Sequence, residues 1–373
     1  MRLILAIIIV LLCGSHALSE DADCERKTEV ICYWGSWSIY REGIGHFTTE
    51  DIDPTLYSEI SSLDTWADID LGGFENITSI KENYTCLKIV LAIGGWNEGS
   101  IKYSVMAATA ESRKKFAEGV LRYLVYYGFD GLDLDWEYPT SRGGILEDGQ
   151  NFASLVTEIK KTISPWNLTL SIAVSIDTSL IGFAYNISAI EQNVDFVNLM
   201  AYDYVLPATA NVTGLSSPLT AIKETVSSWL DAGLSREKLI LGIPTYARTY
   251  ILADDNGHNI GDPVIGEAEP GEFTKEAGFL AYYELLDLMQ DAFLDITSVQ
   301  TDDTNYAYGS NEWYTYETET TVRAKTMYAI DQHLGGIMVW SIDTDDFLGL
   351  YGKKYPLLKT ISEVIMENEP RKK

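Results

Sequence analysis

Short apolar segments alternate with helical patterns along most of this chain, and this alternation constrains its fold more than any other feature. The apolar segments are nearly continuous, as strands covered on both faces are; they are 30–37, 87–96, 129–138, 168–175, 196–204, 239–247 and 336–342. Between them, apolar residues recur at helical spacing, for example in 116–127, 152–163 and 222–230. The pattern predicts a parallel sheet with helices outside it.

Two architectures fit this pattern, an open doubly wound sheet and a closed eight-stranded barrel. The last two apolar segments are separated by far more residues than one helix needs. We therefore interpret the stretch from about 249 to about 332 as an inserted α+β subdomain. The remainder has roughly the 250 residues of a TIM (β/α)8 barrel, which is the fold that we predict.

The N-terminus is typical of a secretory signal peptide. Arg2 is followed by the apolar run 3–13 and then by small residues up to Ala17. Cleavage there would remove 1–17 and leave 18–373 as a secreted, extracellular protein. The apolar run is too short to cross a bilayer. Asn-x-Ser/Thr motifs, which are acceptor sites for N-glycosylation in secreted proteins, are consistent with a secreted protein. They lie at Asn76, Asn83, Asn167, Asn186 and Asn211.

The charge balance excludes some partners. The chain has 55 acidic and 27 basic residues, a net charge of −28. Because phosphate groups bind to cationic surfaces, we expect no nucleic acid and no membrane partner. The sequence has no zinc-ligand spacing and no phosphate-binding glycine loop, so we expect neither a metal nor a cofactor.

The segment 129–138 carries the residues most suited to chemistry. Asp133, Asp135 and Glu137 alternate with apolar residues, so a strand places the three carboxyl groups on one face. Like charges raise one another's pKa, which keeps one carboxyl group protonated near neutral pH. Glu137 comes last, at the end of the strand where barrel active sites form. We predict a general acid here; a solvent-facing acidic strand and a cation site are the alternatives.

The same segment resembles a known family. Asp130, Asp133, Asp135 and Glu137 form Asp-x-x-Asp-x-Asp-x-Glu, which is similar to the signature of family 18 glycoside hydrolases, the chitinases and chitinase-like proteins. Other segments resemble the family's third, sixth, seventh and eighth strands, namely 91–96, 200–204, 242–248 and 335–340. The resemblance covers about 30–349. It implies a TIM barrel with a small α+β subdomain between strands seven and eight.

The resemblance also implies a substrate-assisted mechanism. Glu137 would protonate the glycosidic oxygen, while the acetamido carbonyl of the substrate attacks C1 and configuration is retained. Asp135 would orient the acetamido group, and Asp133 would adjust the pKa of Asp135. Tyr202 and Asp203 would hold the acetamido group. Substrate contacts are implied for Tyr33, Trp37, Trp96, Tyr138, Met200, Tyr246, Arg248 and Trp340. The expected protein is a monomeric chitinase that cleaves β-1,4 bonds within chitin or N-acetylglucosamine oligomers.

The chain departs from the family pattern where a second strand is expected, before Ser61. By resemblance to the family, much of that strand is missing from this sequence, and so is the usual cysteine partner of Cys32. We predict a short or irregular second-strand position. Either residues around 58–63 form a substitute, or the first strand approaches the third and allows a Cys32–Cys86 bridge. Bridges to Cys24 are the alternative.

Two other functions compete with the chitinase. A catalytically impaired chitinase-like lectin would bind chitooligosaccharides without cleaving them, and the missing strand favours it. The presence of Glu137, Asp135, Tyr202 and Asp203 favours the enzyme. A relative that cleaves the chitobiose core of N-glycans would use the same motif.

Overall fold

The computed structural model describes residues 8–11, 28–46, 72–84, 86–301 and 305–368. Its main sheet has eight strands in the order β1-β3-β4-β5-β6-β7-β14-β2. All but β1 run parallel; they are β2 (Glu29–Tyr33), β3 (Ile89–Gly94), β4 (Gly131–Asp135), β5 (Thr169–Val174), β6 (Phe196–Leu199), β7 (Leu239–Pro244) and β14 (Gly336–Trp340). Each of these strands overlaps one of the seven predicted segments, and β2 begins one residue before its segment. The predicted α/β barrel fold is confirmed.

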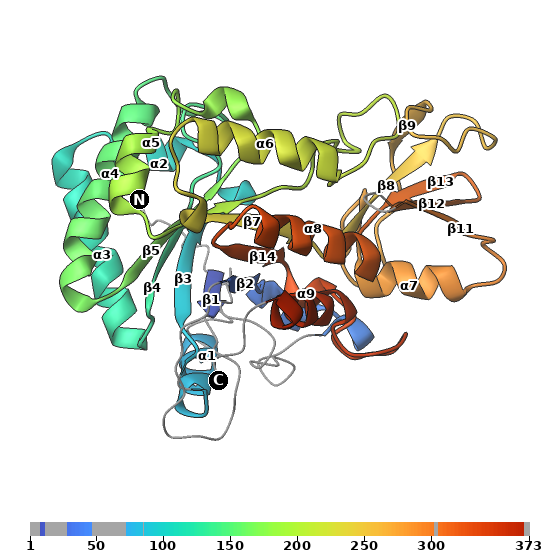
Figure 1. The fold of residues 1–373 in the computed structure, drawn as a ribbon, viewed down its shortest axis with the longest axis horizontal. Helices are drawn as coiled ribbons and strands as arrows, with labels where there is room; N and C mark the ends of the chain where they lie inside the picture. Colours follow the sequence, from blue (N-terminus) through green and yellow to red (C-terminus); the bar gives the residue numbers. More distant parts are fainter. Residues whose placement is uncertain (1–7, 12–27, 47–71, 85, 302–304, 369–373) are drawn as a thin grey trace.

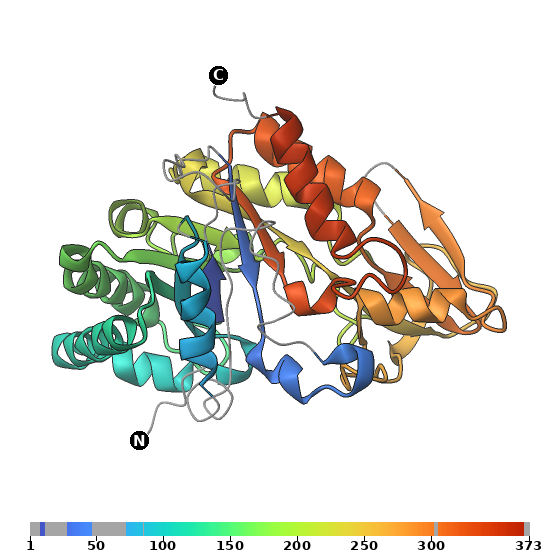
Figure 2. The same cartoon turned by 90° about the horizontal axis from the view of Figure 1, so that it is seen from below.

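Helices cover the outside of this sheet (Figures 1 and 2). They are α1 (Gly73–Ser79), α2 (Ile101–Ala107), α3 (Ala110–Tyr127), α4 (Asp148–Ile163), α5 (Ile187–Asn193), α6 (Leu219–Asp231), α8 (Glu319–Asp331) and α9 (Pro356–Asn368). Helix α3 begins where the Thr109 side chain accepts a hydrogen bond from the backbone N–H of Ser112, and ends at Gly128, which has a φ of 76°. Its first turn and a half carry mostly polar residues, which is why the apolar pattern located only residues 116–127.

The second-strand position is short, as predicted, but an unexpected segment fills it. Strand β1 (Ile8–Leu11) pairs antiparallel with β3, from Ile8 opposite Ala92 to Leu11 opposite Ile89. This strand comes from the predicted signal peptide. The substitute proposed around 58–63 lies outside the described residues.

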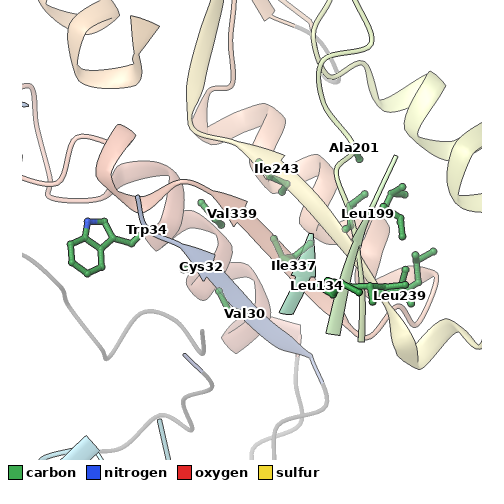
Figure 3. Packing of buried hydrophobic residues seen from close by; sticks show 14 of the residues in the cluster. Val30, Cys32, Trp34, Leu134, Leu199, Ala201, Leu239, Ile243, Ile337 and Val339 are labelled. Atoms are coloured by element: carbon green, nitrogen blue, oxygen red, sulfur yellow. The ribbon is translucent and has the colours of Figure 1, made fainter. Parts of the chain in front are cut away.

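The predicted Cys32–Cys86 bridge is wrong. Cys86 is disulfide-bonded, whereas Cys32 is a buried thiol. The reason lies in the sheet order, because β2 and β3 are not neighbours and β1 lies next to β3. Cys32 is instead opposite Val339 of β14, and both lie in the cluster of buried side chains drawn in Figure 3.

A second sheet follows β7 and forms the part of the molecule on the right of Figure 1. Its strand order is β10-β8-β13-β12-β11, with β9 added to β8, and every pairing is antiparallel. The elements are β8 (Tyr246–Leu252), β9 (Val264–Glu267), β10 (Phe279–Ala281), α7 (Tyr282–Gln290), β11 (Thr297–Gln300), β12 (Asn305–Gly309) and β13 (Glu312–Thr315). An α+β insertion between strands seven and eight is therefore present. Helix α8, which follows, packs against α9 and the barrel strands β7 and β14.

The alternation of side chains along each barrel strand creates two cores. On β2, Val30 and Cys32 face the helices, whereas Ile31 and Tyr33 face the barrel interior with Met338 of β14. Figure 3 shows part of the helix-facing core. The interior core is small and leaves room for polar groups, which form the site described below. Among the described residues, no helix has the length and hydropathy of a membrane span.

Candidate active site

The carboxyl groups of β4 and the residues just after it lie on the interior face, as their spacing predicts. Asp133, Asp135 and Glu137 are all buried, and the apolar residues between them belong to the helix-facing core. Removing three carboxyl groups from water is costly unless they are neutralised or hydrogen-bonded. The surroundings of each group therefore decide its protonation.

Asp133 lies deepest and is the best hydrogen-bonded of the three. Its carboxylate accepts from the Tyr33 hydroxyl at 3.0 Å, the Ser171 hydroxyl at 2.6 Å and the Asn198 amide at 3.1 Å. Burial raises the pKa of Asp133 to about 6, and these hydrogen bonds oppose the rise. The sequence analysis did not identify Ser171 and Asn198 as site residues, although a polar residue inside an apolar strand could have indicated them.

Asp135 has an acceptor atom that the described residues leave unused. No donor among them reaches its buried Oδ1. Burial, followed by the charges of Glu137 and Asp133, raises the pKa of Asp135 well above its ordinary value. The strand β3 passes close by, since a Cβ at Gly94 would lie 1.8 Å from the Asp135 carbonyl oxygen.

Glu137 lies just beyond the end of β4 and carries the properties of a general acid. Burial raises its pKa to about 7; a hydrogen bond from Tyr138 and the charge of Arg142 lower it, and Asp203 raises it. A carboxyl group with this pKa is substantially protonated near neutral pH and can donate its proton.

Arg142 is a residue of this site that sequence reasoning missed. Its Nη1 donates to the carbonyl oxygens of Trp96, at 2.6 Å, and of Glu137, at 3.2 Å. Its guanidinium lies 3.4 Å from the centre of the Trp96 ring. Arg142 therefore ties the loop after β4 to the loop after β3 and places a positive charge near Glu137. Its position soon after a strand with several acidic residues could have indicated that Arg142 belongs to the site.

A second cluster gathers around Asp203, which has a φ of 61°. Its carboxylate accepts from the Tyr246 hydroxyl at 3.0 Å and from Arg248 at 2.9 and 2.6 Å. The ring of Tyr202 lies 6.0 Å from that of Tyr246 and nearly perpendicular to it. Because the residues after β6 meet those of β8 here, two predicted groups of site residues are brought together.

Aromatic rings line the interior beside these carboxyl groups. Trp340, at the end of β14, lies 5.4 Å from Tyr33 and 6.4 Å from Trp37, measured between ring centres. Met200 packs against the same interior core. Trp96 lies apart from this group and is 53% exposed. The described residues contain no group of three or more His, Cys, Asp or Glu side chains placed to hold a metal ion.

Comparison with known proteins shows which family this chain resembles. The model of the family "Glycosyl hydrolases family 18" matches residues 29–345. Mouse chitotriosidase-1 is 34% identical over 90% of this chain and 77% of its own length. The Ostrinia furnacalis Group IV chitinase in complex with allosamidin has a TM-score of 0.86 and 35% identity, covering 90% of this chain and 98% of the other.

A pseudo-chitinase is also similar to this chain. Human YKL-39, described as a pseudo-chitinase with retained chitooligosaccharide binding, has a TM-score of 0.82 and 29% identity, covering 90% of this chain and 98% of its own. The solved structures similar to this chain therefore include both a chitinase and a pseudo-chitinase that binds chitooligosaccharides. With a family model that spans most of its length and chitinases among its relatives, this chain belongs to glycosyl hydrolase family 18.

Proposed function

We propose that this protein is a secreted chitinase that hydrolyses β-1,4 bonds between N-acetylglucosamine units with substrate-assisted, retaining catalysis. One observation carries the proposal: Glu137 is buried with a pKa of about 7, beside an Asp135 whose buried Oδ1 has no hydrogen-bond partner among the described residues. The first group supplies a proton near neutral pH, and the second accepts a hydrogen bond from the substrate.

Glu137 donates its proton to the glycosidic oxygen as the bond to C1 breaks. The carbonyl oxygen of the substrate's own acetamido group forms a bond to C1 and yields an oxazolinium ion. Asp135 Oδ1 accepts the acetamido N–H and offsets the developing positive charge. The Glu137 carboxylate then takes a proton from a water molecule that attacks C1, so configuration is retained.

The remaining predicted residues position the sugar. Tyr202 lies near the acetamido group in this proposal, and the Asp203–Arg248 pair fixes the wall beside it. The apolar face of the sugar rests on Trp340, with Tyr33 and Trp37 packed around that ring. These contacts orient the acetamido oxygen toward C1, which lowers the entropic cost of the attack.

The test is hydrolysis of a fluorogenic chitooligosaccharide by the wild-type protein, Glu137→Gln and the matched control Glu147→Gln. Glu147 is exposed in the same loop, so its variant should keep wild-type activity. Loss of the general acid should reduce kcat by about 10²–10⁴-fold. If Glu137→Gln retains more than a tenth of wild-type activity, Glu137 is not the acid.

A chitooligosaccharide-binding protein without hydrolytic activity is the second candidate. The observation that favours it is the second barrel position, where a full parallel strand is expected but only the four-residue β1 lies, a segment that cleavage after Ala17 would remove. Binding of chitooligosaccharide by the wild-type protein with no product release would support this candidate. An N-glycan with a chitobiose core, used as an additional substrate, tests the alternative that the protein cleaves the core of N-glycans.

Secretion and glycosylation are part of the proposal. The five Asn-x-Ser/Thr asparagines are all exposed, which supports their access to glycosylation. N-terminal sequencing of protein collected from the medium of expressing cells tests cleavage after Ala17. Size-exclusion chromatography with light scattering tests the expected monomer.

A further inference from the structure

A cavity of about 360 Å³ lies in the inserted subdomain, between the loop 269–273, α7 and the strands β8 and β13. Alternation along β8 places Thr249, which lines this cavity, on the opposite face from Arg248 of the candidate active site. We propose that the cavity binds a small organic cation that carries a primary ammonium group. The proposal goes beyond chitin hydrolysis and does not depend on it.

The lining of the cavity has one sign of charge. No Lys, Arg or His is among the described lining residues, whereas carboxyl groups come from Glu269, Glu272, Glu284, Asp287 and Glu312. A concave site with several like charges concentrates counter-ions of the opposite sign. The chain's net charge of −28 adds to this field. The expected ligand is therefore a cation.

Glu284 builds the site rather than binding the ligand. Its buried carboxylate accepts hydrogen bonds from the backbone N–H groups of Phe273, Thr274 and Ala281 at 2.6, 3.0 and 2.8 Å. A Cβ at Gly271 would lie 2.5 Å from Glu284 Oε1, so the loop packs closely on this side chain. The loop that carries Glu269 and Glu272 is thereby held in place before any ligand binds.

Thr249 provides an independent sign of a ligand. It is fully buried and its Oγ1 has no hydrogen-bond partner among the described residues, yet it lines the cavity. An unpaired buried hydroxyl costs free energy that a bound polar group would recover. The hydroxyl can accept from an ammonium or exchange a hydrogen bond with a ligand hydroxyl.

The remaining walls favour an organic cation over a metal ion. The described residues offer no group of three or more carboxyl, His or Cys side chains that could hold a metal. Apolar side chains also line the cavity, among them Phe273, Leu280 and Leu294. A primary ammonium on a short aliphatic chain or a sugar ring matches both features. Putrescine and glucosamine represent these two sources of the same group.

Isothermal titration calorimetry of the full chain with glucosamine, putrescine, N-acetylglucosamine and MgCl₂ tests the proposal. Binding of glucosamine or putrescine, with none of N-acetylglucosamine at this site, is the expected result. Each of Glu269→Gln and Glu272→Gln should weaken binding about two- to fivefold. The isosteric Thr249→Val should weaken it about two- to tenfold. The control Glu267→Gln changes an exposed carboxylate that does not line the cavity and should bind like the wild type.

Several results would overturn the proposal. One is the absence of binding by both amines. Another is unchanged affinity in all three cavity variants, which would place the amine elsewhere. A third is equal binding of N-acetylglucosamine that the cavity variants weaken, which would show that charge plays no part. Thermal denaturation of each variant checks folding, and Thr249→Ala also removes the hydroxyl if Thr249→Val fails to fold.

Discussion

The buried carboxyl group of Glu137 should make the protein less stable as pH rises. Its pKa is about 7 in the folded chain, against an ordinary value of 4.5. Between these two pH values the folded state keeps a proton that the unfolded state has released. The folded state then binds more protons, so the free energy of unfolding falls with rising pH. At about 1.4 kcal/mol per pKa unit, the total loss is about 3 kcal/mol above pH 7.

Glu137→Gln removes this ionisation, so the variant should escape the loss. Relative to the wild type, its free energy of unfolding should increase by about 3 kcal/mol between pH 4 and pH 8. The Glu137 charge also raises the pKa of Asp135. Its removal therefore lowers that pKa and adds to the gain at high pH.

Urea denaturation of both proteins at pH 4 and pH 8 measures this effect. The difference in free energy of unfolding between the variant and the wild type is compared at the two pH values, which cancels any pH-independent effect of the amide. Glu147→Gln, which changes an exposed carboxylate, serves as the control. If the wild type and Glu137→Gln lose stability in parallel from pH 4 to pH 8, the pKa of Glu137 is not raised and its assignment as the acid loses its physical basis. The same pKa predicts that kcat/KM falls above about pH 7.

Three further predictions concern the same site. Arg142→Ala removes a charge that lowers the pKa of Glu137, so the fall in kcat/KM should move to higher pH, while Arg142→Lys moves it less; a shift to lower pH would contradict this. Asp203→Asn weakens the hydrogen bonds that Tyr246 and Arg248 donate to this residue. It should lower the free energy of unfolding by about 1–3 kcal/mol, measured by thermal denaturation, and should also lower activity. Cello-oligosaccharides, which lack the acetamido group, should not be cleaved in a reducing-sugar assay, and cleavage at a rate near that of chitooligosaccharides would exclude substrate assistance.

Local patterns in the sequence determined the framework of this protein. Continuous apolar runs located the seven parallel strands, because a strand covered on both faces must be apolar throughout. Alternation along β4 placed Asp133, Asp135 and Glu137 on one face, because successive side chains of a strand point in opposite directions. Both inferences depend only on neighbours along the chain.

Contacts between distant segments were decided by the tertiary structure alone. Asp203 and Arg248 are 45 positions apart and meet because the residues that follow β6 lie beside the first residues of β8. Arg142 reaches Trp96, 46 positions away, through the loops after β4 and β3. The pairing of β1 with β3 places another strand beside β3 and separates Cys32 from Cys86. Sequence periodicity cannot specify such pairings, because they depend on which strand edges remain available when the whole sheet has formed.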